Sequence, residues 1–181
     1  MNRTRSIWLT SILLIGVAMI VVSGCSSETE TVEEDLESYR GRIGPAYEDA
    51  RNAQFEFETS VQQNLDIDMT VTSAEDSVEN VLDSAALFQG SAGILISILR
   101  SQTPPDRCAI YNSVLIGLME AYSSEADLVV EEMELLSGGT AGSLESREAE
   151  GDRLVEEIAL YISVFPKAEI DCFVVEEPPV S

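Results

Sequence analysis

SAEDSVENVLDSAALFQGSAGILISIL, residues 73–99, is the stretch that decides the fold. Its apolar side chains recur every three or four residues, the spacing at which side chains share one face of an α-helix. Ser73 with Asp76 three residues later is typical of a helix N-cap with an acid in the first turn, and Arg100 follows the last apolar position. The stretch therefore predicts an amphipathic helix whose apolar face comprises Val78, Val81, Leu82, Ala85, Phe88, Ala92, Leu95, Ile96 and Leu99.

The same period continues on the N-terminal side of this stretch. Apolar side chains follow a helical seam from Val32 to Val61, which Gly44 and Pro45 interrupt. Proline is best tolerated in the first turn of a helix, so this element is expected to break or kink at Gly44 and to restart at Pro45.

Two further helical patterns lie on the C-terminal side. One follows the turn at residues 104–106 and ends before the glycine-rich loop 137–142. The other spans residues 143–165, and Pro166 is expected to close it. Four amphipathic helices with mostly short connections predict an all-α fold, an antiparallel up-and-down four-helix bundle.

The first 25 residues have the organisation of a secretory leader. Two arginines among the first five residues precede an apolar run over residues 7–22, and small residues follow. The run is short for a membrane-spanning helix, which needs roughly 20 residues. Positive charge before the run and negative charge after it place the remainder of the chain outside the membrane.

The segment Val22-Ser23-Gly24-Cys25 resembles the lipobox of prokaryotic lipoproteins, and the resemblance covers residues 1–25. It implies a signal peptide over residues 1–24, cleavage just before Cys25, and a lipid on the Cys25 sulfur. Two or three acyl chains would hold the protein firmly on the extracytoplasmic face of the cell membrane, since one chain binds only marginally. The alternative is an uncleaved anchor helix that carries an incidental cysteine.

The remaining chain divides into three parts by composition. Residues 25–34 are polar and acidic without an apolar period, so we expect a flexible acidic tether. Residues 35–175 form the helical bundle domain, and residues 176–181 form a disordered tail.

Two cysteines remain for the bundle. Cys108 lies in the first turn of the third predicted helix, and Cys172 lies six residues beyond Pro166. The start of one helix lies beside the end of its antiparallel neighbour, and the extracytoplasmic compartment permits oxidation, so we predict a Cys108–Cys172 disulfide. Two buried free thiols or a redox pair are the alternatives, although the Cys-x-x-Cys spacing typical of redox enzymes is absent.

The charge of the chain limits its partners. It has 33 acidic and 10 basic residues, and the mature part from Cys25 keeps only 8 of the basic ones, for a net charge of −25. This field repels nucleic acid, so we expect no nucleic-acid partner. It suits cations or basic proteins, and solvated carboxylates also keep a tethered protein soluble.

The residue types needed for most catalytic and metal sites are missing. The sequence has no histidine, which removes His-based triads, most zinc sites and the ferritin type of di-iron centre. Residues 66–70 begin like a calcium loop, but Val71 stands where the glycine belongs and Ser77 where the final glutamate belongs. We therefore expect no cofactor, no metal site and no enzymatic activity.

A few polar groups lie near the apolar faces. Glu125 stands between apolar positions of the third helix, so we expect it at the edge of the core with its carboxylate reaching water. Tyr111, Tyr122 and Tyr161 lie on the apolar faces of the third and fourth helices. We expect these rings to pack in the core with their hydroxyl groups reaching solvent, and an aromatic-lined ligand cavity is the alternative.

These features predict a membrane-tethered extracytoplasmic lipoprotein whose helical domain serves as a binding or structural module. Its partners would be the membrane, through the lipid anchor, and a protein of the cell envelope. The alternative is a lipoprotein that binds a cation or a small ligand on its acidic surface or between its helices. A hydrolytic enzyme is disfavoured because no nucleophile-and-base spacing is visible.

Overall fold

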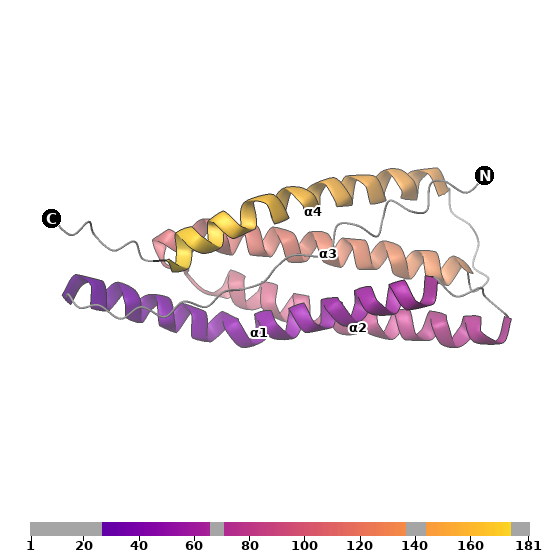
Figure 1. Ribbon diagram of the computed structural model, residues 1–181, viewed down its shortest axis with the longest axis horizontal. Coiled ribbons are helices and arrows are strands. Elements are labelled where there is room, and N and C mark those ends of the chain that lie inside the picture. The colour runs from indigo at the N-terminus through magenta and orange to yellow at the C-terminus, as the bar shows by residue number, and fades with distance from the viewer. Residues whose placement is uncertain (1–26, 66–70, 137–143, 175–181) are drawn as a thin grey trace.

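The computed structural model describes residues 27–65, 71–136 and 144–174, and within these it describes the side chains of residues 33–64, 76–135 and 147–174. The described residues contain four α-helices and a short 3₁₀ helix and no strand. The elements, in chain order, are α1 (Ser27–Leu65), α2 (Val71–Ser101), η1 (Asp106–Cys108), α3 (Ala109–Leu136) and α4 (Leu144–Phe173). They form the antiparallel four-helix bundle that the sequence predicted (Figure 1).

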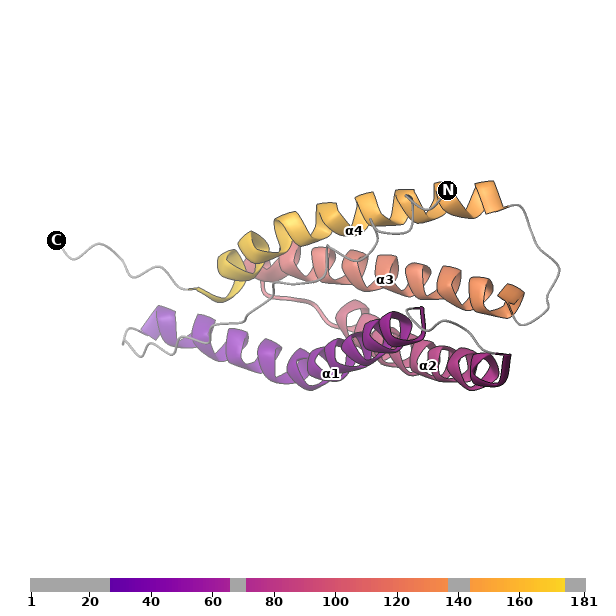
Figure 2. The ribbon, with the colours of Figure 1, turned by 45° about the vertical axis from the view of Figure 1, so that its right-hand side comes forward.

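The four helices are packed as a chain of neighbours rather than as a closed square. α1 packs on α2, α2 packs on α3 and α3 packs on α4, whereas the backbones of α1 and α4 stay apart (Figures 1 and 2). Contacts between residues far apart in sequence show the antiparallel order. Phe57 of α1 stacks on Phe88 of α2 with ring centroids 6.1 Å apart, and Gln89 of α2 donates a hydrogen bond to Asp127 of α3 at 2.6 Å.

α2 supplies the centre of the core, as residues 73–99 predicted. Six side chains of its predicted apolar face are at most 1% exposed: Val81, Ala85, Phe88, Ala92, Leu95 and Leu99. Burying a side chain the size of Leu or Phe contributes about 1.5–3 kcal/mol, so this face contributes strongly to the stability of the bundle. Residues 76–101 are also long and apolar enough to cross a membrane by length and composition alone. Only 28% of the apolar window in this segment is buried in the bundle, and Leu87 and Ile94 of the segment are exposed.

α1 departs from the sequence prediction at two places. It begins at Ser27, so most of the predicted flexible tether, residues 25–34, is helical. It also continues through Gly44 and Pro45 without the predicted break, although Figure 2 shows α1 bending along its length. The exposed ring of Pro45 points to solvent, and Ala46 beside it is buried in the core. Packing of the apolar face therefore outweighs the hydrogen bond that proline removes.

α4 does not end at Pro166, and the prediction that proline closes this helix is wrong. The helix continues to Phe173, with Pro166 exposed inside it. Phe165 precedes the proline and Ala168 and Cys172 follow it, and each is at most 4% exposed. The buried face of the helix therefore continues from one side of the proline to the other. The gain from burying these side chains exceeds the cost of about 3 kcal/mol for an interior proline.

The other predicted boundaries either differ only slightly from those observed or lie outside the described residues. α2 begins at Val71, two residues before the predicted cap at Ser73. Several predicted features lie outside the described residues: the signal peptide 1–24, the lipid-bearing Cys25, the calcium-like stretch 66–70, the loop 137–142, and the tail 176–181.

Candidate functional site

Cys108 and Cys172 form a disulfide bond with their Cα atoms 4.4 Å apart. η1 follows the Pro104-Pro105 turn and carries Cys108 to the start of α3, and the extension of α4 beyond Pro166 brings Cys172 alongside it. Both cysteines are fully buried. The pairing agrees with the predicted disulfide, although α4 reaches Cys172 as a helix rather than as an irregular segment.

Arg107 holds the end of α4 from the neighbouring residue. Its guanidinium donates hydrogen bonds to the carbonyl of Asp171 at 2.9 and 3.1 Å and to the carbonyl of Val174 at 2.6 Å. The last carbonyls of a helix have no partner within it and carry partial negative charge, so a cation there satisfies them. The last turn of α4 has no unpaired basic residue of its own for this purpose. Arg107, 64 residues away in sequence, takes that role.

Phe173 fills the space between α1, α3 and α4 at this end. Its ring lies 5.0 Å from that of Tyr111 in an edge-to-face arrangement and 6.3 Å from that of Tyr39. The guanidinium of Arg40 lies over the outer face, 4.6 Å from the ring centroid. Aromatic pairs and cation–π contacts of this kind each add about 0.5–1.5 kcal/mol. They join α1 to α4 at the disulfide end, where the backbones of these helices do not meet.

A buried polar pair joins α1 to α3 nearby. The hydroxyl of Tyr39, which is fully buried, donates to Oδ1 of Asn112 at 2.9 Å, and the amide of Asn112 lies 3.4 Å from the carbonyl of Leu99. Burial raises the pKa of Tyr39 to about 12, partly offset by Arg42, so the phenol remains a donor. A buried hydrogen bond of this type sets the register between helices, because any slip would leave its groups unsatisfied.

Beyond this end, a row of polar side chains runs along the space between α1, α3 and α4, and we call it the polar seam. α1 contributes Tyr47, Gln54 and Glu58, α3 contributes Tyr122 and Glu125, and α4 contributes Glu169, which acts electrostatically on Tyr47. Of the four tyrosines whose pKa is raised, Tyr47, Tyr111 and Tyr122 have neighbours in this row, and burial is the main cause in each. The seam is the largest continuous group of perturbed ionisable side chains in the described part of the chain.

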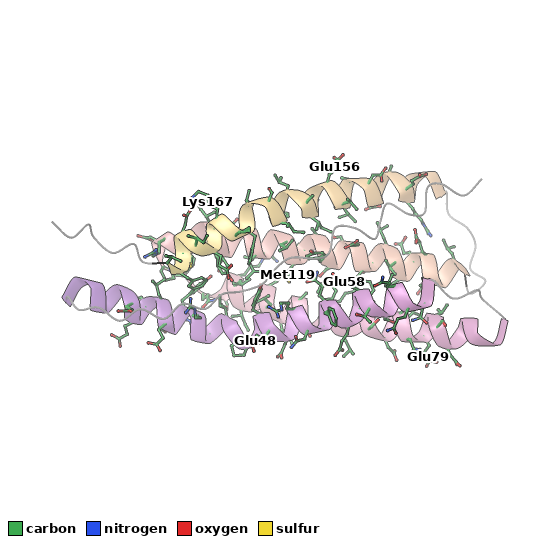
Figure 3. All side chains as sticks on the ribbon, viewed as in Figure 1. Glu48, Glu58, Glu79, Met119, Glu156 and Lys167 are labelled. Carbon is green, nitrogen blue, oxygen red and sulfur yellow. A yellow bond between two sulfur atoms is a disulfide. The ribbon has the colours of Figure 1, made fainter. Side chains whose placement is uncertain are left out.

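The polar seam contains two half-buried carboxylates, Glu58 of α1 and Glu125 of α3. Burial and the nearby Glu58 raise the pKa of Glu125 to about 7. Burial also raises the pKa of Glu58, partly offset by a hydrogen bond of 2.8 Å that Gln54 donates to Glu58 Oε1. Figure 3 shows Glu58 on the side of α1 that faces α3. Glu125 is half-buried, at the edge of the core where the sequence placed it.

The tyrosines serve mainly to pack the core. Tyr111 and Tyr122 are at most 8% exposed, and burial raises the pKa of Tyr122 to about 12. Tyr161 is half-buried and lies against Gly117 of α3, where a Cβ would come within 2.6 Å of the ring. These positions agree with core packing and leave no role for the predicted alternative of an aromatic-lined ligand cavity.

Surface depressions elsewhere carry no comparable chemistry. One, of about 590 Å³, lies between α2 and α3 beside the Arg100–Glu120 ion pair, and another, of about 420 Å³, lies between α1 and α2 near Phe55. Both are open to solvent. In the described ranges, no three acidic or cysteine side chains converge as metal ligands.

Sequence reasoning identified Glu125 and the cysteine pair but missed Glu58. Glu58 follows the buried Phe57 by one residue and looks like an ordinary acid on an acidic helix. Its burial and its hydrogen bond from Gln54 set it apart, and the signal available in the sequence was its spacing of one turn from Gln54 on the same face.

Comparison of the chain with models of protein families, with curated proteins and with solved structures gave no match.

Proposed function

We propose that the protein is a lipoprotein, tethered through Cys25 to the extracytoplasmic face of a membrane, whose helical bundle is a binding or structural module of the cell envelope. The observation that carries the proposal is the buried Cys108–Cys172 disulfide. Structural disulfides persist in oxidising compartments and are rare in the cytosol. This supports export, which the leader over residues 1–24 and the lipobox motif that ends at Cys25 independently predict.

The geometry near the proposed anchor supports a defined orientation. α1 begins at Ser27, two residues after Cys25, and enters the bundle without an intervening loop. The disulfide, Arg107 and the Phe173 cluster consolidate the end of the bundle at which α1 enters. A bundle tethered this way would present the opposite end, where α1 meets α2 and α3 meets α4, away from the membrane.

The anchor is tested by the intact mass of the protein purified from membranes of cells that express the full chain. We expect the mass to show loss of residues 1–24 and addition of acyl chains. Cys108 and Cys172 should react with an alkylating agent only after a reductant has opened their disulfide. The variant Cys25→Ala is the control and should leave the membrane fraction or retain its leader. Recovery of the wild-type chain from the cytosol, uncleaved and unmodified, would disprove the anchor.

The partner role is tested separately by crosslinking in intact cells followed by purification from native membranes. The expected result is one envelope protein enriched over a control lipoprotein of similar abundance. A purification that recovers no specific partner contradicts the module role and leaves the anchor result unaffected.

Cation or small-ligand binding is the second candidate, and the polar seam favours it. Glu58 and Glu125 are half-buried acids of the seam, and burial raises the pKa of both carboxyls. Thermal unfolding in CaCl₂ or MgCl₂, compared with NaCl of equal ionic strength, provides the test. Stabilisation that is specific to a divalent cation and absent from Glu125→Gln supports binding at the seam, whereas equal effects of all salts reject it.

A further inference from the structure

The outer side of α2 is an apolar face that no other described helix covers. α2 packs on α1 and α3, and its remaining side is open (Figure 1). Leu87 and Ile94, two helical turns apart on this side, are each 61% exposed. Small residues occupy the exposed positions around them. We call this face the α2 strip, and its members are Ala86, Leu87, Gly90, Gly93, Ile94 and Ser97.

The α2 strip is uncharged in a chain that is strongly acidic as a whole. No residue from 84 through 99 carries a charge, whereas the full chain has 33 acidic and 10 basic side chains. Two acids of α3 near the strip are already engaged, Glu120 with Arg100 and Asp127 with Gln89. Molecules of the same net charge repel each other least where their surfaces carry no charge. A second copy of the chain can therefore approach closely along this strip.

The two ends of the strip carry opposite charges. Asp83 precedes it on α2 and Arg100 follows it. Arg100 forms an ion pair with Glu120, but 60% of its side chain is exposed, so it has further donors to offer. If two copies pack their strips together in antiparallel order, Asp83 of each copy lies beside Arg100 of the other. Parallel order would instead place like charges together.

The same antiparallel register also matches the uncharged side chains. When Asp83 lies opposite Arg100, Gly90 lies opposite Gly93 of the second copy, where two small residues allow close approach of the helices. Leu87 then lies within about 3 Å, measured along the helix axis, of Ile94 of the second copy. A pair with two-fold symmetry makes each of these contacts twice.

Space for the second copy is present on the surface. A Cβ on Gly90 or Gly93 would meet nothing within 4 Å. An open depression of about 590 Å³ between α2 and α3 borders Gly93, Ser97 and Arg100, so side chains of the second copy can enter there.

We propose that the α2 strip is the contact surface between two copies of this chain, which pair in antiparallel order across α2. A bilayer fits this face less well, because helices that lie on membranes carry lysine and arginine beside their apolar face, and α2 carries Arg100 alone. The pairing does not depend on the lipid anchor and goes beyond the envelope partner proposed above, so the two stand or fall separately.

The size of the strip determines the assay. From Asp83 to Arg100 it is about 26 Å long and one helix wide. The contact therefore belongs to the small interfaces, below about 1,200 Å², that are typical of transient complexes. Covalent capture detects such a contact even where the free copies exchange.

Disulfide crosslinking of the full chain, in whichever cell fraction holds it, tests the pairing. Copies with Asp83→Cys and copies with Arg100→Cys carry different affinity tags, are expressed together and are treated with a mild oxidant. We expect a disulfide-linked dimer that carries both tags. Asp83→Cys expressed alone should give little dimer, because its two cysteines would lie about 26 Å apart along the helix axes, too far for a disulfide.

Two matched substitutions separate the strip from general effects of charge and exposed apolar surface. Leu87→Glu changes the strip, whereas Leu160→Glu changes the outer face of α4, and the two leucines are 61% and 62% exposed. With Leu87→Glu in both copies, the yield of mixed dimer should fall at least about tenfold, because a charge enters the apolar contact twice. Leu160→Glu should leave the yield unchanged. Equal thermal unfolding of the two variants would show that the loss reflects the contact and not the fold.

Three outcomes overturn the pairing. The first is the absence of the mixed dimer, and the second is an equal yield with Leu87→Glu and with Leu160→Glu. The third is quenching of a fluorophore on Ser101→Cys, at the end of the strip, by spin-labelled lipids without any mixed dimer, which would assign the strip to the bilayer.

Discussion

Gly117 of α3 lies directly against the ring of Tyr161 of α4, and it tests how the bundle is packed. A Cβ at this glycine would lie 2.5 Å from Tyr161 Oη and 2.6 Å from Cε1, inside van der Waals contact. Replacing Gly117 by Ala therefore forces the ring of Tyr161 to move. Gly90 of α2 is the matched control, because a Cβ there would meet nothing within 4 Å.

The magnitudes follow from two opposing effects. Ala in place of Gly in a helix interior stabilises by up to about 1 kcal/mol, and Gly90→Ala should show this gain in full. At Gly117 the same gain is opposed by a packing cost of about 1–3 kcal/mol, because the ring of Tyr161 must leave its present contacts. We expect Gly117→Ala to destabilise by about 1 kcal/mol net, a difference of about 2 kcal/mol between the two substitutions.

Urea unfolding at fixed pH measures both changes, and a double-mutant cycle with Tyr161→Ala assigns the cause. In that background the ring is gone, so Gly117→Ala should become stabilising by about 1 kcal/mol, like Gly90→Ala. The reasoning is refuted if Gly117→Ala stabilises the otherwise unchanged chain as much as Gly90→Ala does. It is also refuted if the cost persists without the Tyr161 ring.

Three further substitutions probe the disulfide, the buried polar pair and the proline. Replacing Cys108 and Cys172 together by Ser opens a loop between residues 64 apart, so the free energy of unfolding should fall by about 4 kcal/mol in urea, and reduction of the wild type should match it. Asn112→Ala leaves the buried hydroxyl of Tyr39 without its acceptor and should cost about 2 kcal/mol by thermal unfolding, whereas adding Tyr39→Phe should recover part of that loss. Pro166→Ala restores a backbone donor inside α4 and should raise the free energy of unfolding by about 1 kcal/mol; an unchanged or lower value would show that the helix depends on the proline.

The cysteine pair was predictable because it depends on topology more than on detail. An antiparallel pair of helices brings the start of α3 to the end of α4 whatever the exact side chains are, so Cys108 and Cys172 had to be near each other. The conformation that delivers Cys172 was not predictable in the same way. Proline weakens a helix locally, and only the burial of Phe165 and Ala168 on either side shows that the helix continues.

The two acids of the seam illustrate the opposite case. Glu125 was visible in the sequence because apolar residues surround it on its own helix. Glu58, which acts electrostatically on Glu125, lies 67 positions earlier on a helix rich in acids, and local spacing does not show which of those acids is half-buried. The same holds for Arg107, whose role at the end of α4 depends on the neighbouring helix.

The sequence by itself determined which residues of each helix face inward, because apolar spacing of three to four residues is a property of the helix alone. It also determined the number of helices, their antiparallel order and the proximity of the two bundle cysteines. Only the tertiary structure decided that α1 and α4 continue as helices through their prolines, that Arg107 binds the end of α4, and that Glu58 is half-buried. These outcomes depend on free energies summed over contacts between distant segments, which exceed the local preferences that a sequence displays.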